Sequence, residues 1–448
     1  MQAITLFEHQ ARSYAELGWR ADAAVLMALE RLNAAAGSEL IRVSRHELGA
    51  TQHVGVLRVG DVTIEVLPKI DWDPHGDANA HAGSCPHQAA ARSATRNLLY
   101  MLAYTHGLGI VEQDMSPLLA RRSNWFELLT RLFARELCHQ VQLGIEHSYV
   151  SMAETTSVIR GRWELARQLG RRPHVRHRFD VTHDEFSSDT VLNRAFGLAV
   201  KRLLLWSEDR GNQHLLRAIA QTISEVDPPT SMTPAELSGI HFHRLNERFR
   251  PAFGMARLFL QSLAPELMIG DRRNIAFMLD MNQLFEQFVG QFVVRHRSQI
   301  LPASWADAKI HLQSAGRAVY LAESLPDHQP SFRLIPDIVF SDALNCGRLI
   351  IDTKYKQLDP LARRYRVSES DMYQMVAYAT RLDCPNVLLL YPAWSGAPNA
   401  DIEFRVPTSD IRIRVATINL HQPIERPSGL ISELGALIQS TIASSAKE

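Results

Sequence analysis

The chain has 448 residues, and at roughly 150 residues per domain this length predicts about three domains. Lysine plus arginine and aspartate plus glutamate number 48 each, so a formal net charge of zero excludes a global positive field as the means of binding nucleic acid. Hydrophobic residues make up 46% and charged residues 21%, which excludes a disordered or fibrous chain and indicates a folded, multidomain protein.

The sequence gives no sign of export or of membrane insertion. Its first residues lack a basic segment leading into an apolar core, and no stretch approaches the roughly 18 consecutive apolar residues of a membrane span. The four cysteines form no CxxC pair, which disfavours a disulfide framework or a zinc knuckle. We therefore expect a cytoplasmic protein that does not contact a membrane.

The first part of the chain mixes helix and strand signals. Ala21 to Ala36 is rich in alanine and leucine, which predicts a helix. Val54 to Ile70 alternates around Gly60-Asp61, which predicts a β-hairpin. Residues 1–72 are therefore expected to form a mixed α/β N-terminal domain. Residues 73–95 have little periodicity and are expected to be a linker.

Helical periodicity dominates residues 96–273, so a mostly helical middle domain is expected there. Within it, the stretch from Arg160 to Arg178 contains seven arginines and one acidic residue, Glu164. Arg160 and Arg162 are candidate nucleic-acid contacts, because guanidinium groups bind phosphates. The alternative is a solvated surface in an arginine-rich protein, and the sequence leaves both interpretations open.

Residues 274–448 follow an α/β pattern. The expected elements are a long helix at 275–300, strands at 332–340, 348–355, 387–391 and 411–420, a helix at 371–381, and a terminal helix after residue 430. The predicted fold class is therefore multidomain α+β: a mixed α/β N-terminal domain with a β-hairpin, a mostly helical middle domain and an α/β C-terminal domain.

Two short motifs in this last region point to chemistry. Ile335-Pro336-Asp337 is followed, fifteen residues after Asp337, by Asp352-Thr353-Lys354. Both motifs stand in strands joined by a plausible turn, so the strands are expected to pair as neighbours. Because side chains alternate along a strand, Asp352 and Lys354 share one face. Carboxylates suit a hard cation such as Mg²⁺, which would polarise a phosphodiester for hydrolysis while Lys354 assists.

Three further residues are candidates for the same site. Glu286 lies on the predicted long helix, one residue past Phe285, and can reach the edge of the sheet. Gln374 and Tyr378 are four residues apart on a predicted helix, hence on one of its faces, where they can support the lysine or touch a phosphate.

At these residues the sequence resembles the PD-(D/E)XK nuclease superfamily, and more narrowly the McrC family, the endonuclease subunit of McrBC modification-dependent restriction systems. The matching segments are Leu284-Phe285-Glu286, Ile335-Pro336-Asp337, Asp352-Thr353-Lys354-Tyr355-Lys356, Gln374 to Tyr378, Val62 to Ile70, Arg160-Gly161-Arg162 and Asn193-Arg194. The resemblance implies that residues 274–448 form a PD-(D/E)XK nuclease domain. It also implies that Asp337, Asp352 and Glu286 bind Mg²⁺, that Lys354 is catalytic and that Gln374 and Tyr378 assist. Lys356 is a candidate nucleic-acid contact.

The same resemblance implies that the N-terminal domain, residues 1–72, and the middle domain engage an McrB-like AAA+ GTPase ring as partner. It also implies double-stranded modified DNA, of the 5-methylcytosine type, as substrate. The chain would then stimulate nucleotide hydrolysis and cut when driven by the ring. Two alternatives stay open from the sequence: a non-catalytic adaptor of the ring, and a stand-alone PD-(D/E)XK repair nuclease.

Overall fold

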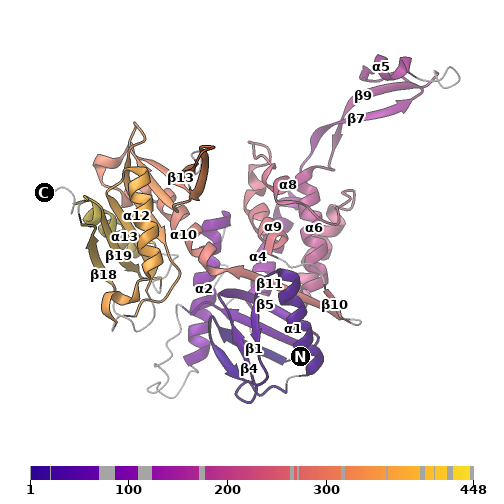
Figure 1. Ribbon diagram of the computed structural model, residues 1–448. Helices are drawn as coiled ribbons and strands as arrows, with labels where there is room; N and C mark the ends of the chain where they lie inside the picture. Colours follow the sequence, from indigo (N-terminus) through magenta and orange to yellow (C-terminus); the bar gives the residue numbers. More distant parts are fainter. Residues whose placement is uncertain are drawn as a thin grey trace. The chain divides into compact units, whose positions relative to one another are not determined.

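The computed structural model describes residues 2–20, 22–69, 86–108, 124–170, 177–262, 267–269, 272–313, 318–359, 362–393, 399–407, 409–420 and 427–443. The chain divides into two compact units. Unit 1 combines Met1–Trp125 with Ala264–Glu448, and unit 2 is Phe126–Leu263. The N-terminal and C-terminal parts of the chain therefore belong to one body, with unit 2 inserted between them in the sequence (Figure 1).

The N-terminal part of unit 1 is built on a five-stranded sheet in the order β1-β6-β5-β11-β10. Its strands are β1 (Gln2–Phe7), β5 (His53–Val59), β6 (Val62–Leu67), β10 (Leu267–Ile269) and β11 (Arg272–Asp280). β5 and β6 form the predicted antiparallel hairpin, with Gly60 at a positive φ of 58° in its turn. The predicted N-terminal helix is α1 (Ala23–Ala36), which packs Leu29 and Leu32 into the core of this sheet.

A smaller three-stranded sheet lies in the same part of the chain. It consists of β2 (Ala11–Ser13), β4 (Glu47–Ala50) and β3 (Ile41–Val43). The mixed α/β character expected of the N-terminal segment is confirmed by these elements.

Two boundary predictions in unit 1 were wrong. Residues 86–95, expected to belong to a linker, form the start of helix α2 (Pro86–His106), while residues 73–85 lie outside the described residues. The helix expected over 275–300 begins only at Met281, because residues 275–280 belong to β11 and pair with β5. Asp280 ends that strand and caps helix α10 (Met281–Arg295) by accepting a hydrogen bond from the Asn282 N–H.

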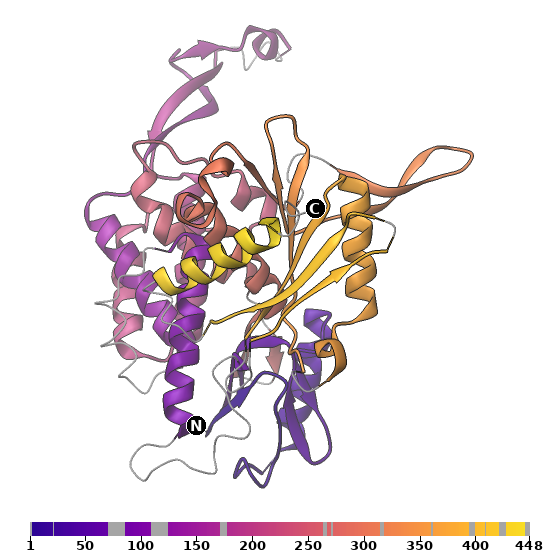
Figure 2. The same cartoon turned by 90° about the vertical axis from the view of Figure 1, so that its left-hand side faces the viewer.

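The C-terminal part of unit 1 is a six-stranded sheet in the order β12-β15-β16-β17-β19-β18. Its strands are β12 (Lys309–Leu312), β15 (Ile338–Ser341), β16 (Gly347–Thr353), β17 (Asn386–Pro392), β18 (Asp401–Arg405) and β19 (Arg412–Ile418). Helix α12 (Glu369–Leu382) covers one face, and the predicted terminal helix, α13 (Ser428–Ala443), covers the other (Figure 2). Helix α10 also contacts β16. The strands β13 (Val319–Ser324) and β14 (Gln329–Leu334) form a separate hairpin.

Unit 2 is a group of helices with a β-ribbon. The helices are α4 (Trp125–Gln142), α5 (Leu165–Leu169), α6 (Val191–Trp206), α7 (Arg210–Thr222), α8 (Pro234–Ser238) and α9 (Arg250–Ser262). The ribbon pairs β7 (Ser148–Thr156) with β9 (Phe179–Ser187) and β9 with β8 (Arg162–Trp163). It projects from the helices of its own unit and carries α5 near its far end (Figure 1).

This ribbon corrects the expectation for residues 96–273, since strands interrupt the helices there. Most of the described side chains of β7 and β9 are exposed or partly buried, so these strands carry little of the apolar alternation by which a strand is recognised in a sequence. Among the described residues, no helix is both long enough and apolar enough to cross a membrane.

Candidate active site

The two motif segments meet at one end of the antiparallel pair β15–β16. Ile338 pairs with Ile351, so Asp337, directly before β15, lies beside Asp352 and Thr353 at the end of β16. The predicted pairing of these strands is thereby confirmed. The apolar side chains of Ile350 and Ile351 are fully buried and hold β16 in the middle of the sheet.

Asp337 is fixed by the middle residue of the second motif. Its Oδ2 accepts hydrogen bonds from the Thr353 backbone N–H and from the Thr353 hydroxyl, both at 2.7 Å. Burial and then the negative charges of Asp352 and Glu286 raise the pKa of Asp337 to about 8, against the effect of the Thr353 hydrogen bonds. The carboxyl group thus stands in a site already rich in negative charge.

Asp352 and Lys354 form a close ion pair. Lys354 Nζ lies 2.7 Å from Asp352 Oδ2, and the Asp352 side chain is almost fully buried. Burial raises the pKa of Asp352 although Lys354 opposes the rise. Burial also disfavours the ammonium form of Lys354, but the carboxylates of Asp352, Asp337 and Asp371 outweigh it and raise the pKa of Lys354. The lysine is therefore a cation at neutral pH.

A hydrogen-bonded chain leads from Lys354 into helix α12. Lys354 Nζ donates to Gln374 Oε1 at 3.0 Å, and Gln374 Nε2 donates to the Tyr378 hydroxyl at 2.7 Å. The Tyr378 hydroxyl donates to the Ile335 carbonyl at 3.1 Å, and burial raises the pKa of Tyr378 to about 12. The structure thus brings Gln374 and Tyr378 together with Lys354. Their hydrogen bonds link the lysine to the segment that carries Asp337.

Glu286 lies at the border of this group. It is a partly buried residue of α10, and its charge acts on both Asp337 and Asp352. Its Oε1 accepts a hydrogen bond from Gln313 Nε2 at 2.8 Å. The helix acid is therefore near the two aspartates, but one of its oxygens is directed to Gln313.

The acidic residues of this group offer oxygen ligands of the kind that hard divalent cations take. The described part of the chain contains no group of three His, Cys, Asp or Glu side chains gathered as a ready metal site. Mg²⁺, however, needs only one or two protein carboxylates, because it keeps waters and substrate oxygens as its other ligands. Asp337 and Asp352 supply two carboxylates whose buried negative charges favour a cation or a proton. The donor set fits Mg²⁺.

Sequence reasoning missed two residues that border the site, Asp371 and Tyr391. The buried carboxylate of Asp371 accepts from Lys356 Nζ at 3.0 and 3.2 Å and from the Tyr391 hydroxyl at 3.4 Å. Asp371 lies three residues before Gln374 in α12, hence on the same helical face, and that spacing was the available signal. The pairing also shows that the Lys356 ammonium group is already neutralised by an acid.

The arginine candidates lie in unit 2, on and beside the β-ribbon. Arg160 pairs with Glu154 at 2.6 Å, and Arg162 lies 3.6 Å from Glu164. Three further arginines of the stretch from Arg160 to Arg178 lie outside the described residues, namely Arg171, Arg172 and Arg176. Within the described residues, both arginines singled out from the sequence therefore have acidic partners.

A second basic segment follows the Asp352-Thr353-Lys354 motif, and sequence reasoning overlooked it. Arg363, Arg364 and Arg366 stand in the connection between β16 and α12, where Arg363 and Arg364 are exposed, whereas Tyr365 packs against the core of the sheet. Arg366 lies 3.8 Å from Asp359. Among the described residues, Arg363 and Arg364 have no acidic partner within 4.0 Å, which leaves two exposed guanidinium groups for a ligand.

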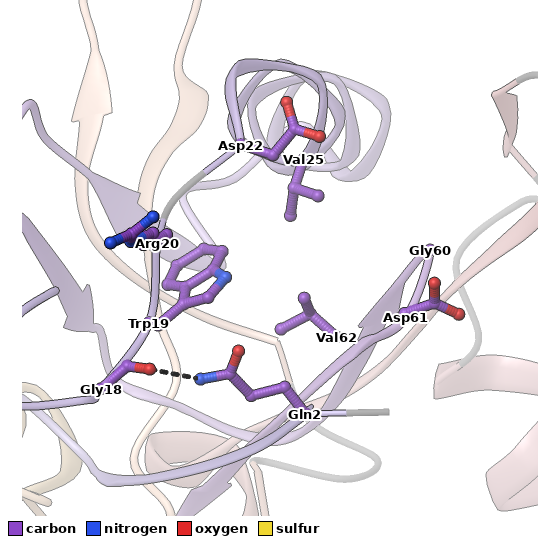
Figure 3. Close-up of a pocket in the computed structure, with 9 residues that line it drawn as sticks. All are labelled: Gln2, Gly18, Trp19, Arg20, Asp22, Val25, Gly60, Asp61 and Val62. Carbon is purple, nitrogen blue, oxygen red and sulfur yellow. Dashed lines mark hydrogen bonds between the residues drawn. The ribbon is translucent and has the colours of Figure 1, made fainter.

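A surface hollow of about 620 Å³ lies elsewhere, in the N-terminal part of unit 1 (Figure 3). It is lined by the β5–β6 turn, the start of β1 and the residues before α1, and Gln2 Nε2 donates to the Gly18 carbonyl within it. Its charged lining residues are Arg20, Asp22 and Asp61, and it shares no residue with the group around Asp337.

Comparisons with known proteins identify a family and two similar solved structures. Residues 48–392 match the family described as McrBC 5-methylcytosine restriction system component. The fold is similar to a chain in a refined half-complex from a tetradecameric assembly of Thermococcus gammatolerans McrB AAA+ hexamers with bound McrC. That match has a TM-score of 0.61 and 22% identity, and it covers 98% of this chain and 99% of that chain.

A chain in the cryo-EM structure of the Thermococcus gammatolerans McrBC complex is also similar, with 27% identity and a TM-score of 0.48, over 66% of this chain and 88% of that one. No curated protein matches the chain.

Proposed function

The chain belongs to the McrBC 5-methylcytosine restriction system component family, and on that premise we propose that it is the DNA-cleaving subunit of such a system. The observation that carries the proposal is the site at the start of β15 and the end of β16. The buried Asp352, the half-buried Asp337 and a cationic lysine stand together there, and the lysine is held by Gln374. This is the arrangement expected of a PD-(D/E)XK nuclease domain over residues 274–448.

Asp337 and Asp352 would hold Mg²⁺, with Glu286 as a further acid at the border. When bound, Mg²⁺ would supply Lewis-acid stabilisation of a phosphoryl oxygen. Thr353 keeps Asp337 oriented through its two hydrogen bonds. Asp352 holds Lys354 in place through the 2.7 Å ion pair, so that both groups are set before the substrate arrives.

Lys354 would act as a cation rather than as a base. Its pKa is raised by the surrounding carboxylates, so it keeps its proton at neutral pH. A protonated amine beside the scissile phosphate stabilises the extra negative charge of the transition state and can donate a hydrogen bond to it. Gln374 and Tyr378 limit the directions that the Lys354 side chain can take.

We further propose that the chain acts with an McrB-like AAA+ GTPase ring on double-stranded DNA containing modified bases. The similar chain of T. gammatolerans stands in an assembly of McrB AAA+ hexamers with bound McrC. The β-ribbon of unit 2 favours the proposal of a protein partner, because large apolar side chains are exposed on it. They include Tyr149, Met152, Trp163 and Phe186.

The test uses the chain with its AAA+ partner, GTP, Mg²⁺ and methylated DNA. We expect Asp352→Asn to reduce cleavage by at least about a hundredfold, because the variant keeps the volume of the side chain but removes the charge that holds cation and lysine. Binding to the partner and stimulation of GTP hydrolysis should be unchanged.

The matched control is Asp342→Asn, at the opposite end of the same hairpin. Asp342 accepts backbone hydrogen bonds from Leu344 and Cys346 in the exposed turn, and the variant should cut at the wild-type rate. Wild-type cleavage by Asp352→Asn would instead support a non-catalytic adaptor. Cleavage by the wild-type chain without any partner would support a stand-alone nuclease.

A further inference from the structure

Glu8, a buried residue just after the first strand of the chain, contacts the segment that follows β16. Glu8 directly follows β1, and its side chain is fully buried. Its Oε2 accepts hydrogen bonds from the Tyr355 hydroxyl at 2.8 Å and from the Lys69 backbone N–H at 3.2 Å. Its Oε1 has no hydrogen-bond partner among the described residues. Glu8 and Tyr355 both belong to unit 1.

Tyr355 stands between the two lysines of the motif. Its side chain is buried, and its ring lies 5.7 Å from the ring of Phe285, the residue before Glu286 in α10. The tyrosine therefore contacts the N-terminal part of unit 1 through its hydroxyl and α10 through its ring. Nothing in the proposed chemistry requires a tyrosine there.

The two lysines point to the opposite side of the same segment. Lys354 reaches Gln374 and Lys356 reaches Asp371, and both of these partners belong to α12. β16 ends at Thr353, and the hydrogen bond from the Lys356 N–H to the Lys354 carbonyl closes a three-residue turn centred on Tyr355. The position of the Tyr355 side chain therefore constrains the directions in which both lysines leave this turn. The Lys354 N–H also donates a hydrogen bond to the Leu390 carbonyl.

We propose that Glu8 and Tyr355 are positioning residues, whose hydrogen bond anchors the chain behind Lys354 and so fixes the direction in which Lys354 reaches the scissile phosphate. This inference rests on the proposed nuclease function. It makes the N-terminal sheet part of the support of the active site, although Glu8 touches neither the substrate nor the lysine.

Glu8 performs this role without needing a negative charge. Burial raises the pKa of Glu8 to about 8, and the opposing effects of the Tyr355 and Lys69 hydrogen bonds are smaller. Near neutral pH the group is therefore mostly a neutral carboxyl, with one oxygen accepting from Tyr355. A glutamine offers the same neutral acceptor at the same place, whereas a leucine of similar volume offers none.

The experiment measures the steady-state rate of cleavage as a function of DNA concentration, using the full chain with the partner ring, GTP and Mg²⁺. We expect Tyr355→Phe and Glu8→Leu each to lower kcat by about tenfold to a hundredfold with KM for DNA unchanged, because a small displacement of a catalytic group has an effect of this size. Glu8→Gln should restore most of the rate. The double variant Glu8→Leu/Tyr355→Phe should be no slower than the slower single variant, since both remove one interaction.

Two controls separate positioning from general loss of stability. Tyr14→Phe removes a hydroxyl that donates to the Ser44 carbonyl at 2.6 Å in the same N-terminal part, and its kcat should equal that of wild type. Thermal unfolding of every variant shows whether it is folded. If Glu8→Leu does not fold, Tyr355→Phe decides alone, because it keeps the ring packed on Phe285.

The outcomes distinguish the two proposals. A wild-type complex that does not cut overturns the nuclease function and the positioning role together. A wild-type complex that cuts, with Tyr355→Phe and Glu8→Leu folded and equal to it in kcat, overturns the positioning role alone. The same holds if Glu8→Gln is as slow as Glu8→Leu, because the acceptor oxygen would then not be the feature that matters.

Discussion

Asp337 and Asp352 combine two features that are each unfavourable for a carboxylate, namely burial and a like-charged neighbour. An aspartate in water ionises near pH 4, whereas the pKa of Asp337 is raised to about 8. At neutral pH the pair therefore retains a proton, and a bound cation would displace it. The affinity of the proposed Mg²⁺ site for the ion, measured by titration calorimetry, should therefore rise as the pH rises toward 8.

Glu65, which lies outside the proposed active site, allows a prediction about the stability of the protein. Burial raises the pKa of Glu65 to about 7, although its Oε1 accepts a hydrogen bond from the Trp125 N–H at 2.9 Å. Between about pH 4.5 and 7 the unfolded chain has lost this proton and the folded chain retains it, so the free energy of unfolding falls as the pH rises through that window. Glu65→Gln should remove this pH-dependent fall in the free energy of unfolding. At pH 8 the variant should therefore be more stable than wild type by roughly 1–3 kcal/mol.

Urea unfolding at pH 5 and pH 8 measures this difference. Other buried acids titrate in the same range, so the quantity of interest is the variant minus wild type at each pH. Glu30→Gln, on the exposed side of α1, serves as the control and should leave the pH profile unchanged. A Glu65→Gln profile parallel to that of wild type would contradict the prediction.

Local sequence rules were enough for part of the site. Strand alternation placed Asp352 and Lys354 on one face, and helical spacing placed Gln374 with Tyr378, as the structure shows. Such rules carry no information on contacts between distant segments. Glu8 is therefore invisible as a partner of Tyr355 in the sequence, because the two residues are 347 positions apart.

The elements around α10 show a second limit. Residues 275–280 are buried almost throughout and continue directly into a helix, so an apolar run alone does not reveal where the strand ends. The strand assignment depends on β5, a partner that lies far earlier in the sequence. The hairpin at Gly60 was predictable because its two strands and its turn are adjacent.

The pairing of β5 with β11 can be tested at one glycine. Gly55 lies opposite Met278, and a methyl group added there would collide with the backbone of Phe277 and Met278. We expect Gly55→Ala to lower the free energy of unfolding by about 1–3 kcal/mol, because the two strands must separate to admit the methyl group. Gly49→Ala in β4 is the control, since its new methyl group would meet Arg42 Cβ at 3.4 Å and Ala11 Cβ at 3.7 Å, ordinary contacts. Equal unfolding midpoints for the two variants would contradict the pairing.

The order of the domains along the chain also reflects distant pairing. Unit 1 is discontinuous, because β11 returns to the N-terminal sheet after unit 2 and continues into the helix that carries Glu286. The proposed active site and the N-terminal sheet are consequently parts of one folded body. A prediction based on length and composition divides the chain in sequence order and cannot detect such a return.

The chain has no net charge, so the affinity for DNA that the proposed function requires must come from local groups. The exposed Arg363 and Arg364, in the connection that follows the proposed catalytic strand, are the candidates that the structure adds. Removing one arginine that neutralises a DNA phosphate should reduce the slope of log affinity against log salt by about 0.9. We therefore expect Arg363→Ala/Arg364→Ala to weaken binding to DNA of any sequence and to lower this slope by up to about 1.8.

Binding is measured in the Asp352→Asn background with the partner ring present, so that DNA is not cut during the titration. The control replaces Arg31 and Arg45, two exposed arginines of the N-terminal part, and alters the net charge equally. An equal decrease of slope in both double variants would mean that overall charge, rather than binding at this connection, governs the affinity. If only Arg363→Ala/Arg364→Ala shows the decrease, the DNA backbone passes beside the end of β16, within reach of Lys354.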